Sequence, residues 1–216
     1  MTNLEAVLDE TTVLIPAAGP VPEGLLSLSN IACTAQIPVA GRPVIYWTLT
    51  YLRKLGFRKF VMAVPKRGLF VEDFVECTVG RDCQFALVSP TKPHGKLGDT
   101  VSLLLQQTKT RAALVVLGDT YFQFSDPTIL AANEPFVLTA PVVESYRWNI
   151  AETTPDGHVA RFKDKVPNLQ GTLEALIGVY FFPDIEVPRC VIAEVAGKME
   201  RIDFTAVLDG VRAQSS

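Results

Sequence analysis

Short aliphatic runs that alternate with longer amphipathic stretches constrain the fold of this chain more than any other feature. Thr12–Ala17, Lys59–Val64 and Ala112–Leu117 are each rich in β-branched or aliphatic residues. Runs of this length are typical of strands buried on both faces of a sheet. Between the first two, Arg42–Leu55 carries apolar residues at helical spacing and stops before Gly56. The order strand, long loop, helix, strand predicts a βαβ unit.

The alternation continues along the chain and then changes character. A turn at residues 155–157 (Pro-Asp-Gly) predicts a hairpin in the second half, so we expect a mostly parallel sheet followed by an antiparallel portion. The fold class predicted is α/β, and without a repeat or a linker we expect one domain over residues 1–216. The further helices expected are Phe70–Cys77, Gly98–Thr108 and Asp203–Arg212, and the further strands are Gln84–Val88, Phe136–Val142, Ile150–Glu152, His158–Phe162 and Ala175–Phe182.

Charge and composition exclude several classes of partner. The 216 residues hold 20 Lys and Arg against 23 Asp and Glu, a net charge of -3, so no general basic field supports binding to nucleic acid. No apolar run approaches about 18 residues, so we expect no membrane partner. The acidic stretch Met1–Glu10 lacks the pattern of a signal peptide, and we expect a cytoplasmic protein. The four cysteines form no C-x-x-C pair, which favours reduced thiols over a metal or disulfide framework.

Two segments at the ends of predicted strands are candidates for ligand binding. Small residues in Leu14–Gly19 would let backbone N–H groups approach a phosphate, although the residue types alone favour a tight turn with close packing. The segment matches neither the dinucleotide G-x-G-x-x-G pattern nor the P-loop pattern. Asp119 follows Leu117 and Gly118, where a carboxylate can hold Mg²⁺ bound to substrate phosphates. An ordinary turn or helix-capping aspartate is the alternative interpretation of Asp119.

Together with later segments, these two resemble the sugar-1-phosphate nucleotidyltransferase family. The family combines a strand entering a glycine-rich loop, a "KP-x-x-PV-x-GKP" segment, a metal aspartate in "GD", an "R-[YF]-G-V-[VI]-E" segment with a following "EKP", and an "x-G-I-Y-x-F" strand. The matching segments here occur in the same order and cover about residues 12–185. They are Val13–Gly19, Ile37–Ile45, Val115–Asp119, Arg147–Glu152 with Asp156–Lys165, and Ala175–Phe182.

The resemblance implies a Rossmann-like nucleotidyltransferase fold, a three-layer sandwich, and a reaction between an NTP and a sugar 1-phosphate or related phosphate that releases pyrophosphate. It implies catalytic roles for Asp119, which would hold Mg²⁺ as the metal residue, and for Lys165, which would contact the sugar phosphate. The residues implied near the nucleotide are Ala17, Ala18, Gly19, Gly95, Gly98 and Gly118. Those implied near the sugar phosphate are Asn149, Asp164, Lys165 and Gly178.

The chain departs from the family pattern where the family places its cations. The first loop reads Gly19–Leu26, without the family's second glycine, threonine and arginine, and Pro20 and Pro22 remove two N–H donors. The lysine of "KP" is replaced in Thr34-Ala35, and the family's later "W-x-D-x-G-T" segment with a second metal aspartate is absent. Lys92 and Lys96 are possible substitutes, or simply solvated lysines. The only two histidines, His94 and His158, have no metal-ligand spacing and receive no catalytic role.

Three functions follow as hypotheses. The first is an active nucleotidyltransferase, and the second is a catalytically inactive domain of the same fold that binds a nucleotide, a sugar ligand or a protein partner. A glycosyltransferase that uses nucleotide sugars ranks last, because Gly118–Tyr121 lacks the D-x-D pattern of such enzymes. The absent final segment also suggests a homo-oligomer or a companion domain.

Overall fold

The computed structural model describes residues 3–25, 31–65, 78, 80, 82–90, 95–169 and 171–214. Within these residues the first part of the chain contains α1 (Asn3–Asp9), β1 (Thr11–Pro16), the 3₁₀ turns η1 (Glu23–Leu25) and η2 (Thr34–Gln36), β2 (Pro38–Val39), β3 (Arg42–Pro43), α2 (Val44–Leu55), β4 (Lys59–Ala63), β5 (Gln84–Val88), α4 (Leu97–Gln106) and β6 (Ala112–Val116). The second part contains η3 (Pro127–Ala132), β7 (Phe136–Val142), η4 (Ser145–Arg147), β8 (Asn149–Thr153), β9 (Val159–Asp164), β10 (Leu173–Phe182), α5 (Glu186–Ala196) and α6 (Phe204–Gln214).

The described strands form one eight-stranded sheet and a two-stranded ribbon, β2–β3. In the large sheet β5, β4, β1 and β6 lie side by side and run parallel, as the βαβ pattern predicts. β10 then pairs antiparallel with β6, β7 and β8, and β8 pairs with β9 as a hairpin. A mostly parallel sheet with an antiparallel second half is therefore confirmed, and the α/β fold class with it.

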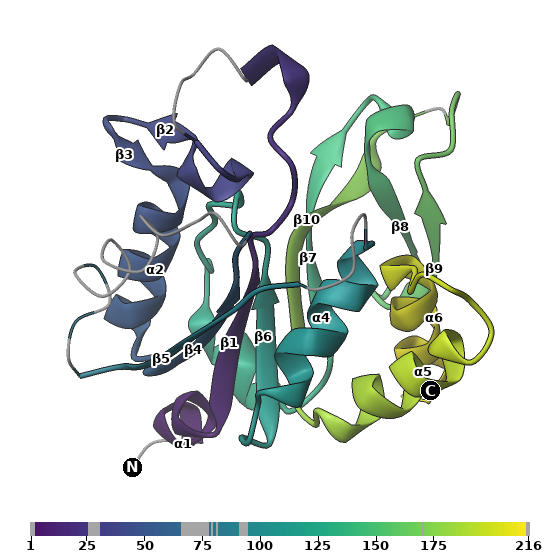
Figure 1. Cartoon of the computed structure of the whole chain (residues 1–216). Helices are drawn as coiled ribbons and strands as arrows, with labels where there is room; N and C mark the ends of the chain where they lie inside the picture. The colour runs from purple at the N-terminus through teal and green to yellow at the C-terminus, as the bar shows by residue number, and fades with distance from the viewer. Residues whose placement is uncertain are drawn as a thin grey trace.

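Successive side chains of the buried strands point to opposite faces of the sheet, so the core consists of two layers of side chains. Val13 and Ile15 of β1 pack with Ile45 and Leu49 of α2 on one face, whereas Leu14 faces the layer beneath α4, α5 and α6. Helices thus cover both faces of the sheet, which gives the three-layer arrangement in Figure 1.

The expected elements are present with small differences in their bounds. α2 begins at Val44 and not at Arg42, because Arg42 and Pro43 pair with the strand before them, and it ends at Leu55, before Gly56 (φ +117), as expected. The predicted turn at residues 155–157 closes the β8–β9 hairpin, with the Gly157 N–H donating to the Thr154 carbonyl. α1 and α5 are additional helices, and the expected helix Phe70–Cys77 lies outside the described residues.

Candidate functional site

The carboxyl ends of β1 and β6 form the floor of the candidate site. The Gly118 N–H donates to the Pro16 carbonyl over 3.1 Å, which joins the two strand ends. A Cβ atom on Gly118 would lie only 2.6 Å from the Cβ of Ala17 and 3.1 Å from that of Ala35. Glycine at position 118 therefore lets the turn after β6 contact both the residue directly after β1, Ala17, and the 3₁₀ turn η2, which contains Ala35.

β10 fixes the same turn from the other side. The Leu117 N–H donates to the Gly178 carbonyl over 2.9 Å, and the Thr120 hydroxyl donates to the Ile177 carbonyl over 2.9 Å. Gly178 has φ +86, and a Cβ atom there would lie 2.7 Å from the Leu117 side chain. Both the backbone conformation and the packing of Gly178 thus require glycine.

Asp119 lies at the centre of this turn with its side chain exposed to solvent. In the part of the chain that the structure describes, its carboxylate has no hydrogen bond or ion pair. The buried Cys33 is close enough for electrostatic interaction: burial raises the pKa of the Cys33 thiol, and the charge of Asp119 adds to this effect. Cys33 is buried, whereas the exposed carboxylate of Asp119 is available for a cation.

Magnesium is the cation that the sequence predicts, and the residues fit it to a limited extent. Mg²⁺ is commonly held by one or two carboxylates together with substrate phosphates and water, so an exposed, unpaired carboxylate is a suitable protein ligand. Within the described ranges, no three His, Cys, Asp or Glu side chains come together as a metal-binding group. Asp119 would therefore need oxygen atoms from a bound substrate to complete the coordination.

The N-terminus of α4 lies beside the start of α6. Lys96 donates from its ammonium nitrogen to Oδ2 of Asp203 over 2.9 Å, although 107 residues separate them. This hydrogen bond raises the pKa of Lys96. Gly98 is buried, and a Cβ atom on it would lie 2.4 Å from the Ile202 carbonyl oxygen, whereas Gly95 is exposed. The need for glycine at position 98 thus arises from packing against the segment before α6.

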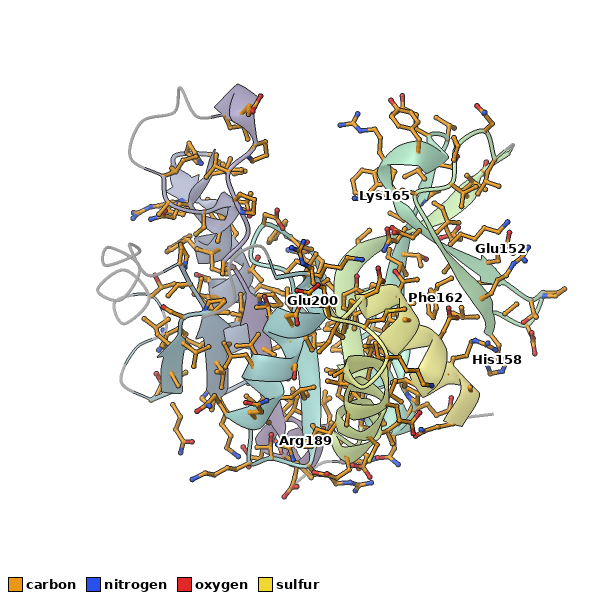
Figure 2. All side chains as sticks on the ribbon, turned by 45° about the vertical axis from the view of Figure 1, so that its right-hand side comes forward. Glu152, His158, Phe162, Lys165, Arg189 and Glu200 are labelled. Atoms are coloured by element: carbon orange, nitrogen blue, oxygen red, sulfur yellow. The ribbon has the colours of Figure 1, made fainter. Side chains whose placement is uncertain are left out.

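The β8–β9 hairpin carries the residues predicted near the sugar phosphate. Asn149 and Asp164 are directly paired in the register of the two strands, and Nδ2 of Asn149 donates to the Thr205 hydroxyl of α6 over 2.9 Å. Lys165 follows with its backbone at φ +48, and its N–H donates to the Trp148 carbonyl over 3.2 Å. Figure 2 shows Lys165 and His158 at opposite ends of the hairpin.

The predicted residues therefore come together as three groups on the carboxyl edge of the parallel strands, where ligands of open α/β sheets bind. Ala17, Gly118 and Asp119 lie at the ends of β1 and β6, with Gly178 packed beside them. Ala18 is half-buried and Gly19 exposed directly after β1. The other groups are the α4 terminus and the hairpin end, which are linked because the charge of Asp164 acts on Lys96. Among the described residues, no hydrogen bond joins Asp119 to Lys165.

Several residues that shape this edge were not predicted from the sequence. Thr48 of α2 is fully buried, and its hydroxyl donates to the Thr120 carbonyl over 2.6 Å. Asp203 and Thr205 connect α6 to Lys96 and Asn149. For Thr48, the sequence offers one signal, a threonine on the apolar face of a predicted helix. Nothing in the sequence near Asp203 and Thr205 indicates their contacts with Lys96 and Asn149.

A separate open pocket of about 410 Å³ lies at the end of β7. Val143, Arg147 and Trp148 are among the residues that line it, and none of the predicted site residues does. Across the described part of the chain, no helix has the length and apolar character needed to cross a membrane.

Comparisons with known proteins agree with this geometry at the level of the fold. No protein-family model and no curated protein sequence matches the chain. Among solved structures, a protein described as a glucose-1-phosphate thymidylyltransferase from Bacillus anthracis, in complex with sucrose, superposes with a TM-score of 0.80 at 18% identity, covering 94% of this chain and 83% of that one. HddC from Yersinia pseudotuberculosis gives 0.70 at 17% identity, covering 90% and 83%.

A third structure, a UDP-glucose pyrophosphorylase complexed with UDP-glucose, gives a TM-score of 0.74 at 16% identity, covering 95% of this chain and 86% of that one. HddC is also known in complex with GMP-PN. The chain thus has the fold of the sugar-1-phosphate nucleotidyltransferases, as the ordered motifs predict.

Proposed function

We propose that this chain binds a nucleoside triphosphate and a sugar 1-phosphate, or a related phosphate, and transfers the nucleotidyl group with release of pyrophosphate. The observation that carries the proposal is that three features lie on one edge of the sheet: Asp119, whose carboxylate is unpaired among the described residues, the small residues after β1, and the lysine of the hairpin, Lys165. The ligands of the three structural neighbours, which include a nucleotide analogue and a nucleotide sugar, are consistent with these reactants.

The reaction needs the two substrates held in line more than it needs proton transfer. A phosphate oxygen of the sugar phosphate attacks the α-phosphorus of the triphosphate; the new P–O bond forms as the bond to the β-phosphate breaks, and pyrophosphate leaves. Since the nucleophile is already anionic, no general base is required. Lys165 would hold the attacking phosphate, and the backbone of the half-buried Ala18 and the exposed Gly19 would approach the triphosphate.

Asp119 would hold a magnesium ion together with phosphate oxygens. When bound, that ion would offset the negative charge of the triphosphate. Gly118 and Gly178 act behind this surface: their close packing on Ala17 and Leu117 sets the position of the turn that presents Asp119.

The test is pyrophosphate release from each common nucleoside triphosphate, with glucose 1-phosphate and other sugar phosphates as acceptors. We expect magnesium-dependent release that falls by at least about 100-fold in Asp119→Asn, since charge stabilisation of this kind contributes a few kcal/mol. Asp156→Asn, in the exposed turn at the far end of the hairpin, is the matched control and should retain full activity. Absence of release from every combination would contradict the proposal.

A second candidate function is a non-catalytic domain of this fold that binds a ligand or a protein partner. The observation that favours it is the first loop, where exposed Pro20, Pro22 and Glu23 supply neither a cation nor their full set of N–H donors. Thermal unfolding with nucleotides or sugar phosphates, with and without Mg²⁺, distinguishes a domain that binds these small molecules, catalytically or not, from one that binds only a protein partner. A ligand that binds the folded state raises the melting temperature by mass action.

A further inference from the structure

One end of the antiparallel part of the sheet carries a concentration of exposed apolar side chains. Among the described residues, half of the large apolar side chains that are exposed to solvent come from this end: Val143, Tyr146, Trp148 and Val166. Val143, directly after β7, is 79% exposed, and Tyr146 of η4 is 58% exposed. Single exposed apolar residues are ordinary on a protein surface, but a contiguous group of them indicates a site of interaction.

Two hydrogen bonds hold the segments that supply these residues together. The Lys165 N–H donates to the Trp148 carbonyl over 3.2 Å, and the Leu169 N–H donates to the Ser145 hydroxyl over 3.2 Å. These bonds fix η4 and the residue before β8 against the segment that follows β9, at the end of the hairpin that Lys165 marks in Figure 2. The exposed apolar residues therefore belong to one surface, although they come from separate parts of the sequence.

The open pocket of about 410 Å³ at the end of β7 lies in this surface. Val143 and Trp148 supply apolar walls, and the charged residues of its lining are Glu144 and Arg147. Tyr146, on the turn between those two charges, does not line the pocket, and its exposed ring can contact a second molecule. Tryptophan, tyrosine and arginine are the residues that most often dominate the binding energy of protein interfaces. The surface thus combines an exposed aromatic side chain with a pocket that can receive one.

The charges on this surface are balanced and incompletely paired. Nη1 of Arg147 lies 3.6 Å from Oε2 of Glu144, and the two side chains are 62% and 51% exposed. This separation exceeds that of an ordinary hydrogen bond, so both groups can accept another partner. Asp164 and Lys165, exposed at the adjacent end of the hairpin, again contribute one charge of each sign. An acid beside a base is complementary to its own copy, because a two-fold axis brings each arginine to the glutamate of the other copy.

We propose that two copies of this chain associate about a two-fold axis through this surface, which we call the hairpin-tip surface. It consists of Val143, Glu144, Tyr146, Arg147, Trp148 and Val166. Arg147 of each copy pairs with Glu144 of the other, and Tyr146 of each copy enters the pocket of the other. The inference is independent of the proposed function, because neither Asp119 nor Lys165 belongs to the surface. A surface of this size is typical of weak association, so we expect a dissociation constant of about 1–100 μM.

The experiment is sedimentation velocity of the whole chain over a series of concentrations, combined with charge reversal. Arg147→Glu and Glu144→Arg should each weaken the dimer by at least about tenfold, since like charges then face each other across the axis. An equimolar mixture of the two variants should form a mixed dimer, in which each acid again meets a base. We expect the affinity of this mixed dimer to lie within about threefold of the wild-type value.

A third variant tests the aromatic contact and leaves both charges in place. Tyr146→Ala should weaken the dimer by about tenfold or more, because a tyrosine that fills a pocket is a common source of binding energy at an interface. Tyr121→Ala, which removes a similarly exposed tyrosine from the loop after β6, is the matched control and should change the affinity by less than about twofold. Thermal unfolding of each variant shows that it is folded.

The mixture separates pairing between copies from a contact within one chain. Loss of the contact between Glu144 and Arg147 inside a chain cannot be repaired by adding another variant, so restored association requires contact between the copies. A wild-type chain that stays monomeric up to millimolar concentration overturns the inference. A dimer that Arg147→Glu, Glu144→Arg and Tyr146→Ala leave intact overturns it too, as does a mixture of the two folded charge variants that stays monomeric.

Discussion

Gly118 and Ala17 lie so close that a Cβ atom on the glycine would come within 2.6 Å of the Cβ of the alanine. Real Cβ atoms do not approach this closely, so the ends of β1 and β6 are packed at a separation that only glycine permits. Because Asp119 is the next residue, the contact also determines where the site's free carboxylate lies.

Gly118→Ala should therefore lower the free energy of unfolding by about 1–3 kcal/mol, the usual cost of inserting a methyl group into a well-packed contact. The neighbouring atoms belong to Ala17 and Ala35, whose short side chains cannot rotate away. Urea denaturation measures the change, and Gly19→Ala, where no atom lies within 4 Å, is the control and should cost much less. Equal losses for the two variants would contradict the packing argument.

A comparison of Gly178 with Gly157 separates the energetic cost of close packing from the cost of the backbone conformation. Both have positive φ, +86 and +88, but only Gly178 faces a neighbour, the Leu117 side chain at 2.7 Å. Gly157→Ala should cost about 1 kcal/mol, from the left-handed backbone alone, and Gly178→Ala about 3 kcal/mol, since overpacking is added. Thermal or urea unfolding of the two variants checks the difference.

The pair Lys96–Asp203 should make stability depend on pH at both extremes. Burial raises the pKa of Asp203, but the hydrogen bonds from Lys96 and the Thr205 N–H outweigh it, and the pKa lies below its ordinary value of 3.8. The stabilisation from the carboxylate is thus present above pH 3.8 and is lost as the pH falls through the lowered pKa. The raised pKa of Lys96 means that the lysine contribution is present below pH 10.5 and is lost as the pH rises through that raised pKa.

Asp203→Asn should accordingly have a lower free energy of unfolding than the wild type at neutral pH. This difference in free energy should become smaller in acid and in strong alkali. Denaturation curves collected across the pH range measure this difference. Lys96→Met is the reciprocal variant and should show the same narrowing; a difference that is constant from acid to alkali would contradict the role of the pair.

Thr48→Val should lower the free energy of unfolding by about 1–3 kcal/mol, because the carbonyl of Thr120 loses the hydroxyl donor that the buried Thr48 supplies. Valine has nearly the shape of threonine, so the change removes the hydrogen bond without leaving a cavity. Thr50→Val, on the exposed side of the same helix, is the control. Because the Thr120 carbonyl lies next to Asp119, we also expect weaker magnesium-dependent ligand binding in Thr48→Val alone.

The cysteines should differ strongly in their reactivity with a thiol reagent. Burial excludes reagent from Cys33 and raises the pKa of its thiol, so little thiolate forms at mildly alkaline pH. Cys190 is exposed and should react before Cys33. Peptide-resolved mass spectrometry during labelling gives the order, and ligand binding over Asp119 should slow the Cys33 reaction further.

Periodicity predicts the sheet and most of its helices because burial on both faces leaves a local signal. β1, β4 and β6 are nearly continuous aliphatic runs, and their neighbours on the two faces follow from the alternation of side chains. α5 was missed because Pro188 lies in its first turn, where proline is tolerated but weakens a helical pattern. α1 has a single buried residue, Leu8, so its amphipathic pattern is too short to recognise.

The candidate site, like the fold, could be predicted from the sequence only in part. The strand-end position of Asp119 and the hairpin position of Lys165 follow from motif order, but the contacts that fix them do not. Lys96 and Asp203 are separated by 107 residues, and Asn149 and Thr205 by 56. Spacing along the chain carries no information about such pairs, because they arise only when α6 packs across the ends of α4 and β8.

The position of β10 has a consequence for the newly synthesised chain. β6 is buried along its whole length and pairs with β1 on one side and with β10 on the other, yet β10 begins at Leu173. Until that strand emerges from the ribosome, the outer backbone groups of β6 have no partner, and an open apolar edge of this kind recruits other chains. Synthesis that stalls between β9 and β10 should therefore yield a fragment that aggregates or requires chaperones, because one edge of β6 stays unpaired.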